Sequence, residues 1–140
     1  MERTRLAPTV GIAACLALVV VLVVPFALVR TPGAVATYYS SGAVNPLFAG
    51  LFALVAVIVF AAGREDRSDP ALAAGAALVF GLFIVAFCVV WLASGPTEVI
   101  LSLDETGLVQ TLQYHPYVVT LVSLFVPAAA AWYARALGLV

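Results

Sequence analysis

The sequence predicts an all-α membrane protein, a bundle of four transmembrane helices in a single domain that covers residues 1–140. Two observations predict this class. The chain is 65% hydrophobic and 9% charged, whereas soluble domains are about half apolar and about one-quarter charged. Its 140 residues also leave room for four apolar runs of the roughly 20 residues that cross a bilayer. No separate soluble domain fits beside them.

Four apolar runs are expected to form the membrane helices, and they lie at residues 7–29, 46–62, 70–93 and 116–137. The first run is longer than the roughly 7–15 apolar residues of a signal peptide, so we expect it to be retained as a helix. Residues 30–45 and 94–115 then form two outer loops. The polar segment GREDRSDP joins the second and third runs, and a turn this short connects antiparallel neighbours.

Local signals mark the ends and bends of these helices. Asn45 and Asp69 each precede a proline, and their side chains can accept hydrogen bonds from the free amides of a first helical turn. Gly63 permits the left-handed conformation that commonly ends a helix. Pro25 and Pro127 fall inside the first and fourth runs, where a missing amide predicts a bend.

Arginine sets the expected orientation, because the chain has no lysine. If the N-terminus is cytoplasmic, the outer loops carry only Arg30 and the inner segments carry the other five arginines. The positive-inside rule then predicts a multi-pass protein of the cell membrane with both termini in the cytoplasm. The aromatic residues agree, with Trp91 near the outer boundary and Trp132 and Tyr133 near the inner one, as aromatic belts require.

The two halves of the sequence resemble each other, which is compatible with two tandem helical hairpins. The second and fourth runs both open on a polar residue followed by proline, Asn45-Pro46 and His115-Pro116. His115 therefore has a simple interpretation as a polar residue that starts a helix. On this interpretation, His115→Asn should leave stability nearly unchanged.

The residues around His115 form a candidate outer-face interaction site. A proton sensor or a metal ligand is the alternative to the helix-start role, because histidine titrates near neutral pH and binds metals. A metal site normally needs three or four ligands, and that set cannot be completed without assuming how the loop folds, so we favour the helix-start role. The candidate residues are Glu98, Asp104, Glu105, Tyr114, His115 and Tyr117.

The second outer loop, residues 94–115, is expected to be structured. The segment DETG has turn chemistry and lies between two segments rich in β-forming residues, which favours a short hairpin. An interfacial helix that ends at Gly107 is the alternative. Its three carboxylates form no ligand pattern, so a solvated loop is favoured over a cation-binding surface.

The helices lack the groups that most membrane enzymes and ion-coupled carriers use. Within the predicted boundaries there is no Asp, Glu, Lys or His, and the one arginine is Arg135 near the end of the fourth run, although such groups usually mark an ion or proton path. We predict no catalytic residues, no metal and no cofactor. Cys15 and Cys88 are expected to be free, buried thiols, because their estimated depths in the bilayer differ by roughly 15 Å.

A stripe of small residues on the third run, Ala73, Ala77 and Gly81, allows another helix to approach closely. Packing within the chain is favoured over a homodimer face. The expected partners are the lipid bilayer and either a second copy or another membrane protein. Nucleic acid is not expected, because the chain has no cluster of basic residues.

The absence of lysine, the Ala/Val-rich helices and the sparse acidic outer loops resemble small uncharacterised four-helix membrane proteins of halophilic archaea. The resemblance covers the whole chain and rests on composition and layout. It implies a membrane protein of unknown activity. We therefore predict a non-enzymatic structural or accessory subunit, and the alternative is a small channel or carrier for a neutral or apolar solute.

Overall fold

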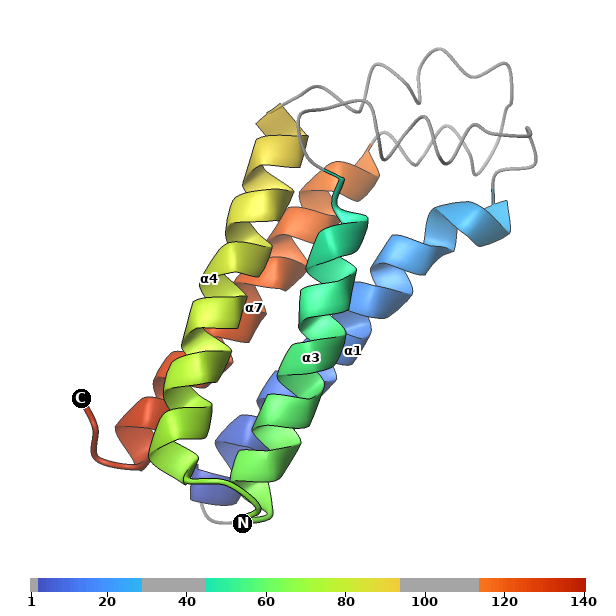
Figure 1. Ribbon diagram of the computed structural model, residues 1–140. Coiled ribbons are helices and arrows are strands. Elements are labelled where there is room, and N and C mark those ends of the chain that lie inside the picture. The colour runs from blue at the N-terminus through green and yellow to red at the C-terminus, as the bar shows by residue number, and fades with distance from the viewer. Residues whose placement is uncertain (1–2, 29–44, 94–113) are drawn as a thin grey trace.

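The computed structural model describes residues 3–28, 45–93 and 114–140, and the elements in these ranges are four α-helices (Figure 1). They are α1 (Arg3–Leu28), α3 (Leu47–Arg64), α4 (Pro70–Ala93) and α7 (His115–Ala136). Each is long and apolar enough to cross a membrane, which confirms the four predicted apolar helices within the described residues. Apart from residues 45, 114 and 115, the two outer loops lie outside the described residues, and so do the alternative hairpin and interfacial helix.

The helices form a ring in which each one packs against two neighbours. α1 contacts α3 and α7, and α4 contacts the same two helices. α1 and α4 therefore lie at opposite corners of the ring. Two tandem hairpins, α1–α3 and α4–α7, would have this arrangement if they were related by an axis parallel to the helices. The chain ends lie at the same end of the bundle, and the far end of α1 leans away from the other helices (Figure 1).

The predicted capping bonds are present at two helix starts. The backbone amide of Leu47 donates to Asn45 Oδ1 at 2.9 Å, and that of Ala71 donates to Asp69 Oδ1 at 3.1 Å. The start of α1 differs from the prediction, because Arg3 to Arg5 form helix rather than a preceding tail. The estimate from bilayer thickness covers only the apolar part of a helix, whereas a charged first turn can extend beyond it into water.

Gly63 does not end its helix as predicted. α3 continues through Arg64, and the left-handed residue that follows is Asp66, with φ 57°. Gly63 is buried, and a Cβ atom at this position would lie 2.7 Å from both the Ala73 Cβ and the Tyr133 hydroxyl oxygen. The glycine therefore leaves room for Ala73 of α4 and for the Tyr133 side chain, which reaches Gly63 from α7, and aspartate tolerates the left-handed turn.

Small residues fill much of the bundle interior. Lipid supplies no hydrophobic driving force between helices, so helices associate through close van der Waals packing, which small side chains permit. A Cβ at Gly11 would lie 2.5 Å from the ring of Phe60, and one at Gly81 would lie 2.8 Å from the Pro127 nitrogen. The buried alanines of α3 and α4 are Ala49, Ala53, Ala56, Ala73, Ala74 and Ala77.

Both cysteines are buried and free, as predicted. Cys15 belongs to α1 and Cys88 to α4, at opposite corners of the ring. Each acts in the interior as a small apolar side chain.

Two aromatic residues lie in the core rather than in the predicted interfacial belts. Trp91 is fully buried at one end of the bundle, and Tyr133 is 1% exposed at the other. Both lie at the expected end of their helix but face inward. The reason is steric, because the small residues at the helix crossings leave space that large rings fill.

Candidate functional site

The six residues of the predicted outer-face site divide into two groups. Glu98, Asp104 and Glu105 lie outside the described residues. Tyr114, His115 and Tyr117 form the start of α7, where both tyrosines are exposed and His115 is 6% exposed. The structure therefore turns the two tyrosines outward and the histidine into the bundle.

His115 makes a hydrogen bond to the backbone of another helix. Its Nε2 atom lies 2.7 Å from the carbonyl oxygen of Val21 in α1. A carbonyl oxygen can only accept, so Nε2 carries the proton and donates. The edge of the imidazole ring also contacts Trp91, with 6.2 Å between the ring centroids.

The Val21 carbonyl is available because of Pro25. In an α-helix each carbonyl accepts from the amide four residues later, and for Val21 that residue is a proline without an N–H. An unsatisfied backbone group inside a membrane costs several kcal/mol. His115 thus supplies, from α7, the donor that the proline in α1 lacks.

This bond corrects the helix-start interpretation of His115. The N-cap of α7 is Tyr114, and no side chain caps that helix start. Asn45 caps its own helix, whereas His115 connects two helices. The two residues occupy equivalent sequence positions but have different roles, so the expectation that asparagine could replace His115 no longer holds.

Two hydroxyl groups of α7, on Thr120 and Ser123, also bond to backbone carbonyls. Ser123 Oγ donates to the Thr120 carbonyl at 2.6 Å, and Thr120 Oγ1 donates to the Pro116 carbonyl at 3.0 Å. Within the described ranges, no group of three or more His, Cys, Asp or Glu side chains could hold a metal ion. The polar groups inside the helices therefore act on the backbone.

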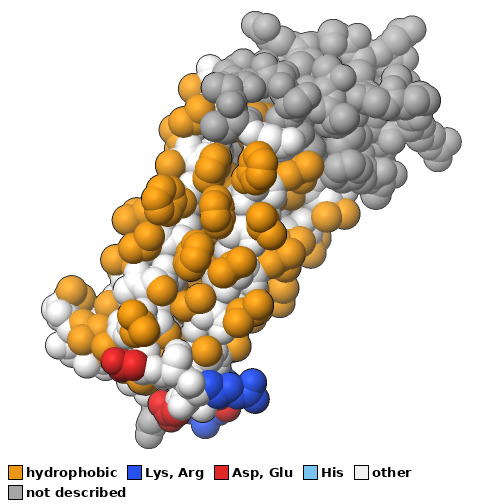
Figure 2. All heavy atoms as spheres, in the orientation of Figure 1, with side chains coloured by type: hydrophobic (Ala, Val, Ile, Leu, Met, Phe, Trp, Pro, Cys, Tyr) orange, Lys and Arg blue, Asp and Glu red, His pale blue; other side chains and the backbone are white. Residues whose placement is uncertain are grey.

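The opposite end of the bundle carries the charged side chains of the described residues. Figure 2 shows acidic and basic groups gathered at the lower end, below a largely apolar surface. Arg64 Nε donates to Thr9 Oγ1 at 2.8 Å, and Thr9 Oγ1 donates to the Arg5 carbonyl at 2.6 Å. Glu65 accepts from Arg64 and lies 3.7 Å from an Arg5 nitrogen. These bonds tie the end of α3 to the start of α1.

A cavity of about 360 Å³ opens at this charged end, and we call it the inner vestibule. All four helices and the α3–α4 turn contribute to it. The sequence argument missed this site, because it assigned Tyr133 to the aromatic belt and Gly63 to a helix end. The lining residues are Thr4, Arg5, Gly63, Arg64, Asp66, Pro70, Tyr133 and Leu137.

Residues 1–138 match the model of a family described as Family of unknown function (DUF7548). The chain belongs to this family. All four helices, His115 and the inner vestibule fall within the matched region. No curated protein and no solved structure matches the chain.

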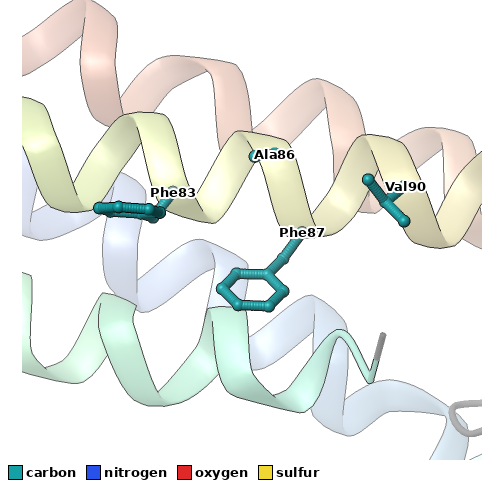
Figure 3. Close-up of a pocket in the computed structure, with 4 residues that line it drawn as sticks. All are labelled: Phe83, Ala86, Phe87 and Val90. Atoms are coloured by element: carbon teal, nitrogen blue, oxygen red, sulfur yellow. The ribbon is translucent and has the colours of Figure 1, made fainter. Parts of the chain in front are cut away.

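The outward surface of this DUF7548 chain is apolar along α4. Figure 3 shows Phe83, Ala86, Phe87 and Val90, which surround a shallow depression of about 150 Å³. Phenylalanine rings connect α4 to α3, with centroids 5.5 Å apart for Phe52 and Phe87. The depression is open on its outer side, away from the bundle interior.

The predicted small-residue stripe lies on the inward side of α4. Ala73, Ala77 and Gly81 are all buried. Ala73 lies beside Gly63 of α3, and Gly81 lies against the backbone of Pro127 in α7. The stripe brings α4 close to both of its neighbours.

Proposed function

We propose that this DUF7548 protein is a non-enzymatic subunit of the cell membrane with a structural or accessory role. The observation that carries the proposal is the closed interior. The phenyl ring of Phe60 lies against the backbone of Gly11, and Gly81 lies against the backbone of Pro127. Contacts this close between neighbouring helices favour a rigid packed element over a conduit.

The polar residues of the interior support the same proposal. His115 and Ser123 are buried polar side chains, and each has a backbone carbonyl as a hydrogen-bond partner. A channel for polar solutes would require a continuous polar path or a water-filled cavity. We also propose that the chain is related to the small four-helix membrane proteins of halophilic archaea. This part of the proposal rests on composition, namely the absence of lysine and the Ala/Val-rich helices.

Two measurements on the purified protein test the proposed role. In liposomes containing the protein, efflux of glycerol and urea should equal that of empty liposomes, because the packed interior leaves no path. Solubilised from its native membrane in mild detergent, the 14.6 kDa chain should migrate in a larger complex with a second, stoichiometric membrane protein. Solute efflux above background from a preparation of the chain alone would contradict the proposal and favour the channel.

The proposed orientation places both chain ends in the cytoplasm. Five arginines and three carboxylates of the described ranges lie at the end that carries the chain termini, and an arginine excess is typical of the cytoplasmic side. We expect Ser68→Cys, in the exposed α3–α4 turn, to be protected from an impermeant thiol reagent on intact cells. Ser41→Cys should react. Labelling of Ser68→Cys before permeabilisation would reverse the orientation.

A further inference from the structure

We infer that the inner vestibule binds the phosphate group of a phosphate ester. The cavity opens at the charged end of the bundle, where the membrane helices reach water, and residues from all four helices line it. This ligand goes beyond the proposed structural role, and its binding is measured independently of any partner protein.

Tyr133 gives the first reason to expect a ligand. Its side chain is 1% exposed, and it lines the vestibule beside Gly63. Among the described residues, no protein group hydrogen-bonds its hydroxyl, although a buried hydroxyl normally has a partner. The free hydroxyl is available to an acceptor inside the cavity.

The remaining lining groups supply more donors than acceptors. Each guanidinium has five N–H groups, and the protein partners of Arg5 and Arg64 use only some of them, chiefly through Glu65 and Thr9. The Arg5 side chain is 51% exposed, so its guanidinium is accessible. An anion with several acceptor oxygens fits this surplus, and paired arginine donors suit phosphate.

The volume of the vestibule and its carboxylate favour a phosphate ester over inorganic phosphate as the ligand. A volume of about 360 Å³ lies at the lower end of the range for small-molecule sites, roughly 300–1,000 Å³. Asp66 is the one lining carboxylate among the described residues, and it can accept from a hydroxyl or amino group of an ester. A lipid headgroup and a soluble glycerol phosphate share this chemistry.

Binding by the delipidated full chain in maltoside detergent tests the inference. Glycerol phosphate and short-chain phosphatidylglycerol are titrated separately, with diacylglycerol as the lipid that lacks phosphate, and binding is followed by native mass spectrometry. Tyr133→Phe removes only the hydroxyl, and its matched control is Tyr117→Phe at the other end. Arg5→Gln removes a lining charge, and its matched control is Arg135→Gln, an exposed arginine outside the cavity.

We expect saturable binding of a phosphate ester, a Kd about tenfold higher in Tyr133→Phe and in Arg5→Gln, and no change in either control. Binding of phosphatidylglycerol without glycerol phosphate identifies a lipid headgroup as the ligand, whereas binding of both identifies the soluble ester chemistry. Thermal unfolding checks that each variant is folded. The absence of saturable binding, or equal losses in Arg5→Gln and Arg135→Gln, would overturn the inference.

Discussion

Replacing His115 with alanine should lower the free energy of unfolding in detergent micelles by about 2–4 kcal/mol. An unsatisfied buried carbonyl costs about 1–3 kcal/mol, and the space left beside Trp91 adds a cavity cost. The carbonyl concerned is that of Val21, whose present donor is His115 Nε2 at 2.7 Å. Reversible unfolding in mixed micelles measures the loss, and Tyr114→Ala at the exposed neighbouring position is the control.

The role of Pro25 makes this prediction specific. In a Pro25→Ala background, the new backbone amide can donate to Val21 as in a regular helix, so loss of His115 should then cost less. We expect a coupling energy of about 1–2 kcal/mol between the two positions, within the range of directly interacting residues. Equal costs of His115→Ala in both backgrounds would contradict the assignment of His115 as the replacement donor.

Two further substitutions at position 115 test whether the length of the side chain matters or only its polarity. The amide nitrogen of glutamine can occupy a position close to that of histidine Nε2, whereas asparagine is shorter by one methylene. His115→Gln should therefore retain more stability than His115→Asn. The reverse order would restore the helix-start interpretation, in which a short polar side chain is sufficient.

The sequence was informative wherever a structural feature depends on local chemistry. The apolar runs predicted four membrane helices, and Asn45 and Asp69 make the predicted capping bonds. The prolines also predicted where helix hydrogen bonds are lost. Each of these features depends on residues within about one helical turn, so the sequence contains the necessary information.

The direction in which side chains face could not be predicted in the same way. In a soluble helix the apolar stripe identifies the buried face, but a membrane helix is apolar on both its lipid side and its packed side. The sequence therefore predicted the correct end of the bundle for Trp91 and Tyr133, but it did not predict that their side chains face the interior. Gly63 shows the same limit, because a local helix-end rule competed with packing against Ala73 and Tyr133.

Contacts between distant segments were beyond the sequence argument for a related reason. Pro25 predicted a bend in α1, but the donor that satisfies Val21 lies 94 residues away from it. The inner vestibule likewise combines Arg5 from α1 with Tyr133 from α7. Identifying either site required knowledge of which helices are neighbours in the ring.

Two glycines in the same helix should respond in opposite ways to the same substitution. A Cβ at Gly81 would lie 2.8 Å from the nitrogen and 2.9 Å from the Cα of Pro127, whereas a Cβ at Gly75 would meet nothing within 4 Å. Because the obstacle at Gly81 is backbone, α4 and α7 must move apart to accept even a methyl group. We expect Gly81→Ala to lower the free energy of unfolding by about 1–3 kcal/mol.

Gly75→Ala is the matched control, with the same chemical change on the exposed side of α4. Alanine restricts the unfolded chain and favours helix, so this variant should be unchanged or more stable by up to about 1 kcal/mol. Unfolding of both variants in the same mixed micelles measures the change in the free energy of unfolding that each substitution causes, and the two changes should differ in sign. A similar small gain in both would mean that α4 and α7 are not in backbone contact at Pro127. The proposed structural role would then lose one of the close helix contacts on which it depends.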